Sequence, residues 1–214
     1  MSKSNEEIEI TKLGNPGNPT GTAGEQMLER MNNSHYEVTG WALDFLEIQN
    51  DDSILDIGCG GGMTLKRISS LSTKGKLYGI DHSQIAVNKT SALNLDLIKN
   101  KRLNVLNGSV EKLPYENNFF NKIITVESFY FWPNPVENLK EVLRVLKHNG
   151  KFLLVADIYG KEGLSEHVLN NIKMFNLLNP TPSEFNEMFK KAGFSKTEIN
   201  FKENTDWIAV IGHK

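Results

Sequence analysis

The sequence predicts an α/β protein whose seven-stranded, mainly parallel sheet is covered by helices on both faces. Seven short apolar runs alternate with segments whose apolar residues recur at helical spacing, as in proteins built from strand–helix units. The first run, residues 53–57, leads into a turn with glycine at every second position, Gly58, Gly60 and Gly62. Such a turn brings bare backbone close to a small ligand, because glycine accepts positive φ and has no Cβ.

The elements follow in order along the chain. Residues 1–23 are rich in Ser, Asn, Gly, Thr and Pro, which predicts a flexible N-terminal tail or an irregular lid. Residues 24–214 are expected to form a single domain that begins with a helical cap at about 24–46. The expected strands lie at about 53–57, 76–81, 103–107, 121–126, 151–157, 195–201 and 206–212.

Helices are expected between these strands, at about 62–71 and 83–99 and after two marked start signals. Asn134-Pro135 and Thr181-Pro182 each combine a capping residue, a proline at the first helical position and a glutamate three residues after the cap. The first of these helices should end near Asn149-Gly150 and the second at Gly193.

Composition limits the classes of function. The chain has 214 residues, 39% of them hydrophobic, and a formal net charge of -2, which gives no electrostatic reason to expect nucleic acid or an anionic membrane as partner. No apolar run is long enough to cross a bilayer, and the N-terminus has no apolar signal core. The single cysteine permits no internal disulfide. We therefore expect a cytoplasmic protein; the oligomeric state stays open.

Two acids next to the glycine turn indicate the kind of ligand. Asp56 precedes the turn by two residues, where a carboxylate would repel a pyrophosphate but suit an ammonium group. Met63 stands where the dinucleotide fingerprint has its third glycine. Asp81 ends the second apolar run, where an acid can accept hydrogen bonds from ribose hydroxyls. Together these acids predict a ligand that has a ribose and an amino-acid-like head. S-adenosyl-L-methionine has both.

A set of motifs carries a family resemblance. They are LDIGCGGG (55–62), GID (79–81), GSVEKLP (108–114), NKIITVESFYFW (121–132) and EVLRVLKHNGKFLL (141–154). In this order and spacing the chain resembles class I S-adenosylmethionine-dependent methyltransferases, of the small-molecule type related to the ubiquinone-biosynthesis methyltransferases. The resemblance covers about residues 50–155. It implies a Rossmann-like sheet with an antiparallel last strand, and methyl transfer to a small-molecule acceptor.

The resemblance also implies site residues. Asp56 would hold the methionyl ammonium, Asp81 the ribose hydroxyls, and the loop at Ser109 the adenine. The residues predicted to bind the cofactor are Asp56, Gly58, Cys59, Gly60, Asp81, His82, Ser109, Val110, Glu111, Val126 and Glu127. No catalytic residue can be identified from sequence, and the candidates are His35, Tyr36, Glu127 and Tyr130. The five histidines show no metal-ligand spacing, so no metal is predicted.

Four other functions remain open. Met63, Asp56 and the lack of a second domain argue against a nicotinamide oxidoreductase. A nucleic-acid methyltransferase is disfavoured because the exit of the fourth strand lacks the Asn/Asp-Pro-Pro-aromatic motif and no basic stripe is present. A protein methyltransferase or a non-catalytic module that binds S-adenosylmethionine would carry the same cofactor motifs. The sequence does not identify the acceptor or the methylated atom.

Overall fold

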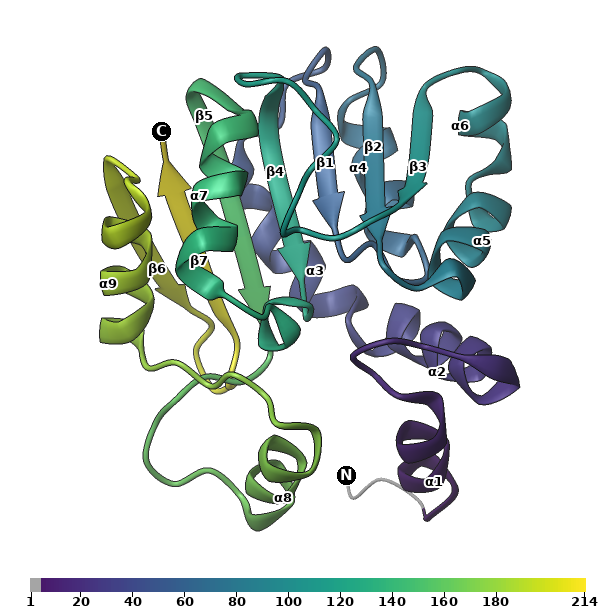
Figure 1. Ribbon diagram of the computed structural model, residues 1–214, viewed down its shortest axis with the longest axis vertical. Helices are drawn as coiled ribbons and strands as arrows, with labels where there is room; N and C mark the ends of the chain where they lie inside the picture. The colour runs from purple at the N-terminus through teal and green to yellow at the C-terminus, as the bar shows by residue number, and fades with distance from the viewer. Residues whose placement is uncertain (1–4) are drawn as a thin grey trace.

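The computed structural model describes residues 5–214 and contains one seven-stranded sheet (Figure 1). Its strands are β1 (Ile54–Ile57), β2 (Leu77–Asp81), β3 (Leu103–Asn107), β4 (Phe120–Val126), β5 (Leu146–Ala156), β6 (Lys196–Phe201) and β7 (Ile208–His213). The spatial order is β3-β2-β1-β4-β5-β7-β6. β7 runs antiparallel to both β5 and β6, while β1 to β5 are parallel. The predicted mainly parallel sheet with an antiparallel last strand is thereby confirmed.

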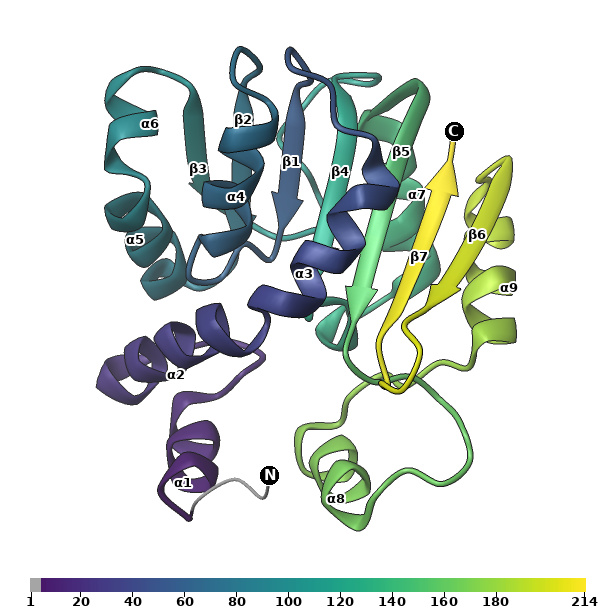
Figure 2. The same ribbon diagram turned by 180° about the vertical axis from the view of Figure 1, so that it is seen from behind.

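Helices cover both faces of this sheet and the ends of its strands (Figures 1 and 2). One face carries α7 (Pro135–Val145) and α9 (Pro182–Ala192), and the other carries α3 (Tyr36–Leu43), the 3₁₀ turn η1 (Asp44–Leu46) and α4 (Met63–Leu71). α5 (Gln84–Leu93) and α6 (Leu95–Lys99) flank the β3 edge. α1 (Asn5–Gly14), α2 (Gly21–Ser34) and α8 (Glu166–Phe175) lie beyond the carboxyl ends of the parallel strands.

Two hydrophobic cores, one on each face, hold these layers together. Phe152 of β5 is fully buried and stacks with Trp132, Phe189 and Phe194, with ring centroids 5.7–6.2 Å apart. On the other face Leu65 of α4 is fully buried in the cluster that joins α3, α4 and the sheet. Because both faces are buried, the strands read as continuous apolar runs rather than alternating ones.

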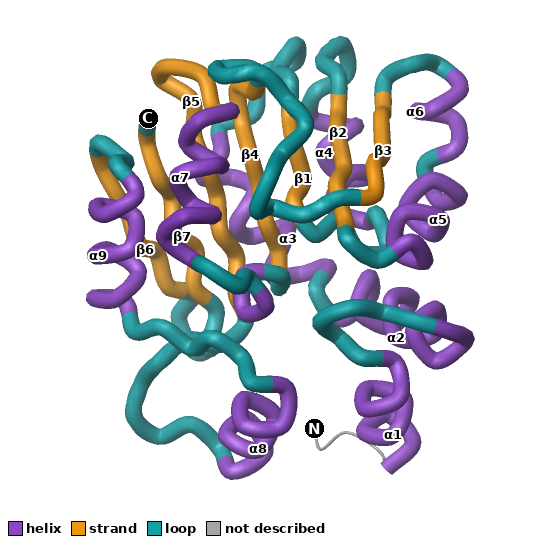
Figure 3. The backbone as a smooth tube through the Cα atoms, in the orientation of Figure 1, coloured by secondary structure: helices purple, strands orange, loops and turns teal. Residues whose placement is uncertain are grey.

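The sheet order reverses between β1 and β4, since the chain builds β2 and β3 on one side of β1 and then returns to its other side. Figure 3 shows that the loops following β1, β2 and β4 gather at the same edge of the sheet, facing α2. In open α/β sheets a crevice for ligands forms at this reversal. None of the described helices is long and apolar enough to cross a membrane.

The structure differs from the sequence expectation in several helices. Residues 5–14, expected as part of a flexible tail, form α1; this segment contains good helix formers, and Thr11 accepts a hydrogen bond from Arg30 of α2. Residues 1–4 of that tail lie outside the described part. The cap helix expected at 24–46 divides at His35 into α2 and α3. Segment 158–180, for which no helix is expected from the sequence, contains α8.

The helix expected at 83–99 divides at Asn94 into α5 and α6. The buried Asn94 amide donates to the carbonyls of Thr90 and Gly62, so its side chain competes with helix continuation while it fastens the glycine turn. The helix expected to end near Asn149-Gly150 ends at Val145 instead, and β5 begins at once at Leu146.

The two marked helix starts are not equivalent. Thr181 and Glu184 form a complete capping box, with Thr181 Oγ1 accepting from the Glu184 N–H at 3.3 Å and Glu184 Oε2 accepting from the Thr181 N–H at 2.7 Å. Asn134 makes no side-chain capping bond; its own N–H donates to Asn138 Oδ1 instead.

Replacing Thr181 by alanine is therefore expected to lower the free energy of unfolding by about 1 kcal/mol, because a helix N–H loses its acceptor. Asn134→Ala is the matched control, with an expected change within about 0.5 kcal/mol. Urea unfolding followed by circular dichroism measures both values. Equal losses for the two variants would contradict the difference between the caps.

Candidate functional site

A cavity of about 400 Å³ lies at the carboxyl ends of β1, β2 and β4, in the range that small ligands occupy. The N-terminal segment, α2 and the start of α3 form its other side. The sequence-predicted residues that line it are His35, Tyr36, Gly58, Cys59, Gly60, Asp81, His82, Ser109, Val110, Glu111, Val126 and Glu127. The fold thus brings together side chains that lie up to 92 positions apart, from His35 to Glu127. Two predicted residues, Asp56 and Tyr130, are not part of the lining.

The glycine turn forms the floor of the cavity. Gly58 and Gly60 have φ of +73° and +52°, in the left-handed region that favours glycine. The Gly58 N–H donates to the Ile80 carbonyl at 2.8 Å, and Thr90 Oγ1 donates to the Gly60 carbonyl at 2.8 Å. A Cβ at Gly58 would lie 2.2 Å from Ser128 Oγ. The turn is therefore held rigidly against the exit of β4.

We expect Gly58→Ala to lower the unfolding free energy by about 1–3 kcal/mol more than the matched change Gly163→Ala. Gly163 has nearly the same φ, +76°, but no atom lies within 4 Å of the position its Cβ would take. The difference between the variants isolates the contact with Ser128, since both carry the same backbone strain. Chemical denaturation measures it, and equal losses would show that Ser128 yields without cost.

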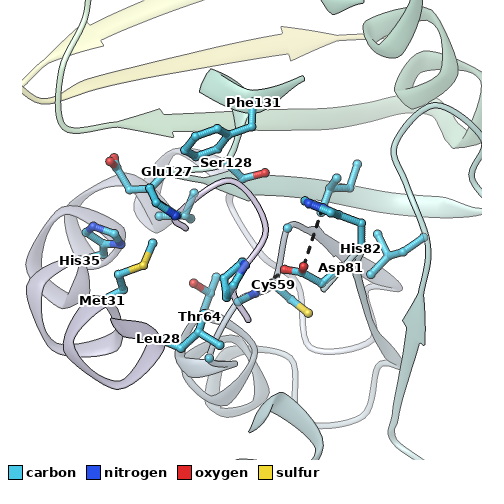
Figure 4. Close-up of a pocket in the computed structure, with 18 of the residues that line it drawn as sticks. Leu28, Met31, His35, Cys59, Thr64, Asp81, His82, Glu127, Ser128 and Phe131 are labelled. Carbon is cyan, nitrogen blue, oxygen red and sulfur yellow. Dashed lines mark hydrogen bonds and ion pairs between the residues drawn. The ribbon is translucent and has the colours of Figure 1, made fainter. Parts of the chain in front are cut away.

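Asp81, at the end of β2, is fixed by backbone donors. Its Oδ2 accepts from the Gly60 N–H and its Oδ1 from the Ser83 N–H, both at 2.9 Å. Burial raises the pKa of Asp81, while these two backbone donors and His82 act in the opposite direction. His82 Nδ1 lies 4.0 Å from Asp81 Oδ1, on the opposite side of the cavity from His35 (Figure 4). Each carboxylate oxygen keeps acceptor capacity for a ligand hydroxyl.

Asp56 lies beneath the turn rather than in the cavity wall. Its side chain is 1% exposed, and neither carboxylate oxygen has a hydrogen-bond partner. Burial, with a smaller contribution from the charge of Asp81, raises the pKa of Asp56 to about 8. A buried acid with no partner is held in its neutral form near neutral pH. The ammonium-binding role of Asp56 stays a prediction, and Asp56 is not among the residues that line the cavity.

The loop after β3 forms another part of the wall. Ser109 Oγ donates to Glu111 Oε2 at 3.2 Å and accepts from the Glu111 N–H, so the two side chains form one small polar turn. Val110 is buried against the core. The assignment of Ser109, Val110 and Glu111 to the adenine remains a prediction.

The N-terminal segment contacts the ligand loops directly, through bonds that the expected helical cap does not specify. Ser83 Oγ donates to the Pro19 carbonyl at 2.6 Å, and Asn32 Nδ2 donates to the Gly61 carbonyl at 3.1 Å. Arg67 lies over the Tyr36 ring, 4.0 Å from its centroid, and bonds to the Tyr36 carbonyl. The only sequence signals for these contacts are an Asn-Pro step and polar residues inside an amphipathic helix.

The exit of β4 supplies an acidic cluster. Glu127 has φ of +54° and is 8% exposed. Tyr130 is buried behind it, and its hydroxyl lies 3.2 Å from Glu127 Oε2 and 3.3 Å from Asp157 Oδ1. One ligating atom each of His35, Glu127 and Asp157 lies within 4.8 Å of the others. We do not assign a metal here, because the carboxyl groups already contact Tyr130 and each other; the predicted absence of a metal remains a prediction.

The aromatic run after Glu127 is divided between core and cavity. Phe129, Tyr130 and Trp132 are buried in the core, although Trp132 also borders the cavity. Phe131 lines the cavity (Figure 4). Met31 and Leu28 of α2 face the cavity from the other side. The cavity fits a nucleoside with a cationic end. The turn offers open backbone and Asp81 an anchored carboxylate for the nucleoside, and the aromatic wall attracts the cation. S-adenosylmethionine, which supplies an activated methyl group, would be held by these residues.

Comparisons with known proteins agree with this site. Residues 55–154 match the methyltransferase domain family. An uncharacterized methyltransferase of Bacillus subtilis, YdaC, is 28% identical over 76% of this chain and 82% of its own length. The ubiquinone/menaquinone biosynthesis C-methyltransferase UbiE of Rickettsia bellii is 27% identical over 80% and 79%. A rice chloroplast 2-methyl-6-phytyl-1,4-hydroquinone methyltransferase is 27% identical over 68% of this chain, which spans only 42% of that relative.

Solved structures show the same fold. A S-adenosylmethionine-dependent methyltransferase from Aquifex aeolicus superimposes with a TM-score of 0.63 and 19% identity, over 96% of this chain and 97% of its own. The matched residues include the glycine turn, β2, β3 and β4, and most of β1 and β5. The matched domain and the methyltransferase-named relatives together support an S-adenosylmethionine-dependent methyltransferase.

Proposed function

We propose that the chain transfers the methyl group of S-adenosylmethionine to a small-molecule acceptor by in-line displacement. One observation carries this proposal: a single cavity of about 400 Å³ is bounded on one side by the glycine turn and Asp81 and on another by Glu127, Phe131 and His35. The side formed by the glycine turn and Asp81 would bind the cofactor. The side formed by Glu127, Phe131 and His35 would bind the acceptor. The cavity is too small for a folded partner but suits a compact molecule.

In this proposal the protein acts mainly by positioning. Asp81 and the turn at Gly58 hold the nucleoside, so that the acceptor atom can be aligned with the carbon–sulfur bond. Alignment of this kind can contribute about 7–11 kcal/mol to lowering a barrier. In this proposal Leu28 and Phe131 reduce the access of water to the cavity. The nucleophilic atom of the acceptor then loses its hydration shell, which makes it more reactive.

The names of the relatives favour an aromatic acceptor. Rice and Rickettsia relatives are named for methylation in hydroquinone and quinone biosynthesis. Phe131, which lines the cavity, offers a ring face against which such an acceptor would stack. We therefore propose a ring-bearing, hydroquinone-like small molecule as the acceptor class.

Two other functions are retained as alternatives. A nucleic-acid or protein methyltransferase would use the same cofactor wall, although the net charge of -2 offers nucleic acid no general attraction. A non-catalytic module would bind the cofactor without turnover. Neither has a specific observation in its favour.

A labelled-methyl assay tests the proposal. The protein is incubated with S-adenosylmethionine carrying a deuterated methyl group and with separated metabolite, nucleic-acid and protein fractions of a bacterial lysate. A mass shift in the metabolite fraction supports a small-molecule acceptor, and a simple hydroquinone added as probe tests the acceptor class. Label confined to nucleic acid or protein would make the small-molecule assignment wrong, and binding without transfer would favour the non-catalytic module.

A further inference from the structure

Two acids and a phenol meet at the ends of neighbouring strands. Glu127 follows β4 and Asp157 follows β5, which pair in parallel. The Tyr130 hydroxyl lies between their carboxyl oxygens at 3.2 and 3.3 Å, and it accepts from the Ile158 N–H at 3.4 Å. Glu127 is buried and lines the cavity, while Asp157 is partly exposed. The fold therefore fixes the three groups as one unit, in which Glu127 faces the cavity.

The two carboxyl groups have more oxygen atoms that can accept a hydrogen bond than they have donors nearby. The single phenol proton of Tyr130 serves one acid at a time, and Glu127 Oε1 is buried without any hydrogen-bond partner. In the part of the chain that the structure describes, neither acid forms an ion pair with Lys or Arg. Two carboxyl groups so placed favour a state in which one of them carries a proton.

The surroundings decide which acid carries it. Burial, and then the charge of Asp157, raises the pKa of Glu127 well above its ordinary value. The other titratable groups that face Glu127 are Tyr130 from the same loop and His35 from the junction of α2 and α3. Burial keeps the phenol of Tyr130 protonated by raising its pKa, so it acts only as a donor. The deeper burial of Glu127 therefore favours it over the partly exposed Asp157 as the acid that holds the shared proton.

The reaction changes the charge of the cavity's contents. S-adenosylmethionine carries a sulfonium cation, and the product S-adenosylhomocysteine carries a neutral sulfide. When the carbon–sulfur bond breaks, its electron pair stays on sulfur; the acceptor's lone pair bonds the methyl carbon, and a hydroxyl or amine acceptor must lose one proton. If a carboxylate takes that proton, its negative charge disappears together with the positive charge of the sulfonium. The net charge of the cavity then stays the same, which limits the free-energy cost of moving charge inside the protein.

We propose that Glu127, bonded to Tyr130 and paired with Asp157, is the proton acceptor of this cavity, protonated beside a neutral ligand and ionised beside a cationic one. This inference rests on the proposed function and adds to it a named residue and an acceptor class, namely acceptors that lose a proton on methylation. Glu127 exchanges one proton with the acceptor, and Tyr130 and Asp157 position it.

Proton-linked calorimetry on the full chain tests this assignment without turnover. Binding heats of S-adenosylmethionine and S-adenosylhomocysteine are measured near neutral pH in phosphate and in Tris, whose different ionisation heats reveal protons released. The two ligands share the ribose and the amino-acid head, so proton changes at Asp81 and Asp56 cancel in the comparison. The cationic ligand is expected to release up to about one proton more per site than the neutral one.

Two variants identify the residue that releases this additional proton. Glu127→Gln keeps the shape of the side chain but cannot titrate, so both ligands should release the same number of protons. Glu203→Gln, an exposed acid in the β6–β7 turn, is the matched control and should behave as the wild type. If Glu127→Gln does not fold, Asp157→Asn replaces it; the pKa of Glu127 should then fall, and the difference between the ligands should shrink.

Equal proton release by the two ligands in the wild type overturns the proposal, as does an unchanged difference in folded Glu127→Gln. The titrations are repeated with EDTA, and a difference that vanishes when metal is removed would also overturn it, in favour of a bound cation. Absence of heat with either ligand would refute the proposed function itself, which keeps the two failures distinct.

Discussion

Replacing Asp81 by alanine is expected to weaken S-adenosylmethionine binding by about 100-fold, or roughly 3 kcal/mol. The Asp81 carboxylate is fixed by the N–H groups of Gly60 and Ser83 and presents its remaining acceptor capacity to the cavity. Hydrogen bonds to a charged acceptor contribute more than neutral ones, about 1.5–3 kcal/mol each. Alanine removes any bond to the ribose and also releases the Gly60 N–H from its partner. Isothermal titration calorimetry measures the loss.

Asp51→Ala provides the matched control for this variant. Asp51 is an exposed acid in the loop before β1, outside the cavity lining, so its removal should leave the affinity within about twofold of the wild type. Asp81→Asn should fall between the two, since an amide oxygen can accept but carries no charge. A folded Asp81→Ala protein that binds with wild-type affinity would remove Asp81 from the cofactor site.

The stability of the ligand-free protein is expected to fall between about pH 4 and pH 8 because of Asp56. Its folded-state pKa is about 8, against an ordinary value of 3.8, so the folded protein holds a proton there that the unfolded chain has lost. A folded state that binds more protons is destabilised as pH rises. One pKa unit corresponds to about 1.4 kcal/mol, so the effect has an upper limit of about 5–6 kcal/mol.

The variant Asp56→Asn should remove the Asp56 contribution to this pH dependence, because its amide is neutral throughout the range. Relative to the wild type, it should gain stability steadily from pH 4 to pH 8 in urea unfolding experiments. The slope of the unfolding free energy against pH is compared between the variants, rather than the free energy at one pH. A buried amide without hydrogen-bond partners lowers the stability by a constant amount at every pH, and this does not change the slope. Asp51→Asn controls for the loss of an exposed charge. Parallel curves for wild type and Asp56→Asn would show that Asp56 is ionised in the folded protein.

The strands and the edge at which they present ligand groups could be predicted from the sequence. Buried parallel strands read as apolar runs, and the carboxyl ends of such strands meet at one edge, which is why Gly58, Asp81 and Glu127 were expected together and lie in one cavity. The antiparallel β7 followed from the resemblance rather than from the residues themselves.

The rest depends on tertiary contacts that leave little trace in the sequence. Asp56 ends a strand in the same way as Asp81, but it lies under the turn, and only the packing of the opposite face shows this. The break at His35 and the helix α8 arise where propensities are ambiguous and long-range contacts decide. Asp157 and Glu127 are 30 positions apart, and their contact through Tyr130 becomes visible only in three dimensions.

The N-terminal helices are fastened to the two loops that carry the ligand groups. Pro19 bonds Ser83 beside Asp81, and Asn32 bonds Gly61 within the glycine turn. Occupancy of the cavity and docking of these helices must therefore reinforce each other to the same extent, because thermodynamic coupling between two events is reciprocal. We therefore expect a ligand in the cavity to strengthen these two contacts, and release of Pro19 and Asn32 from the loops to weaken ligand binding.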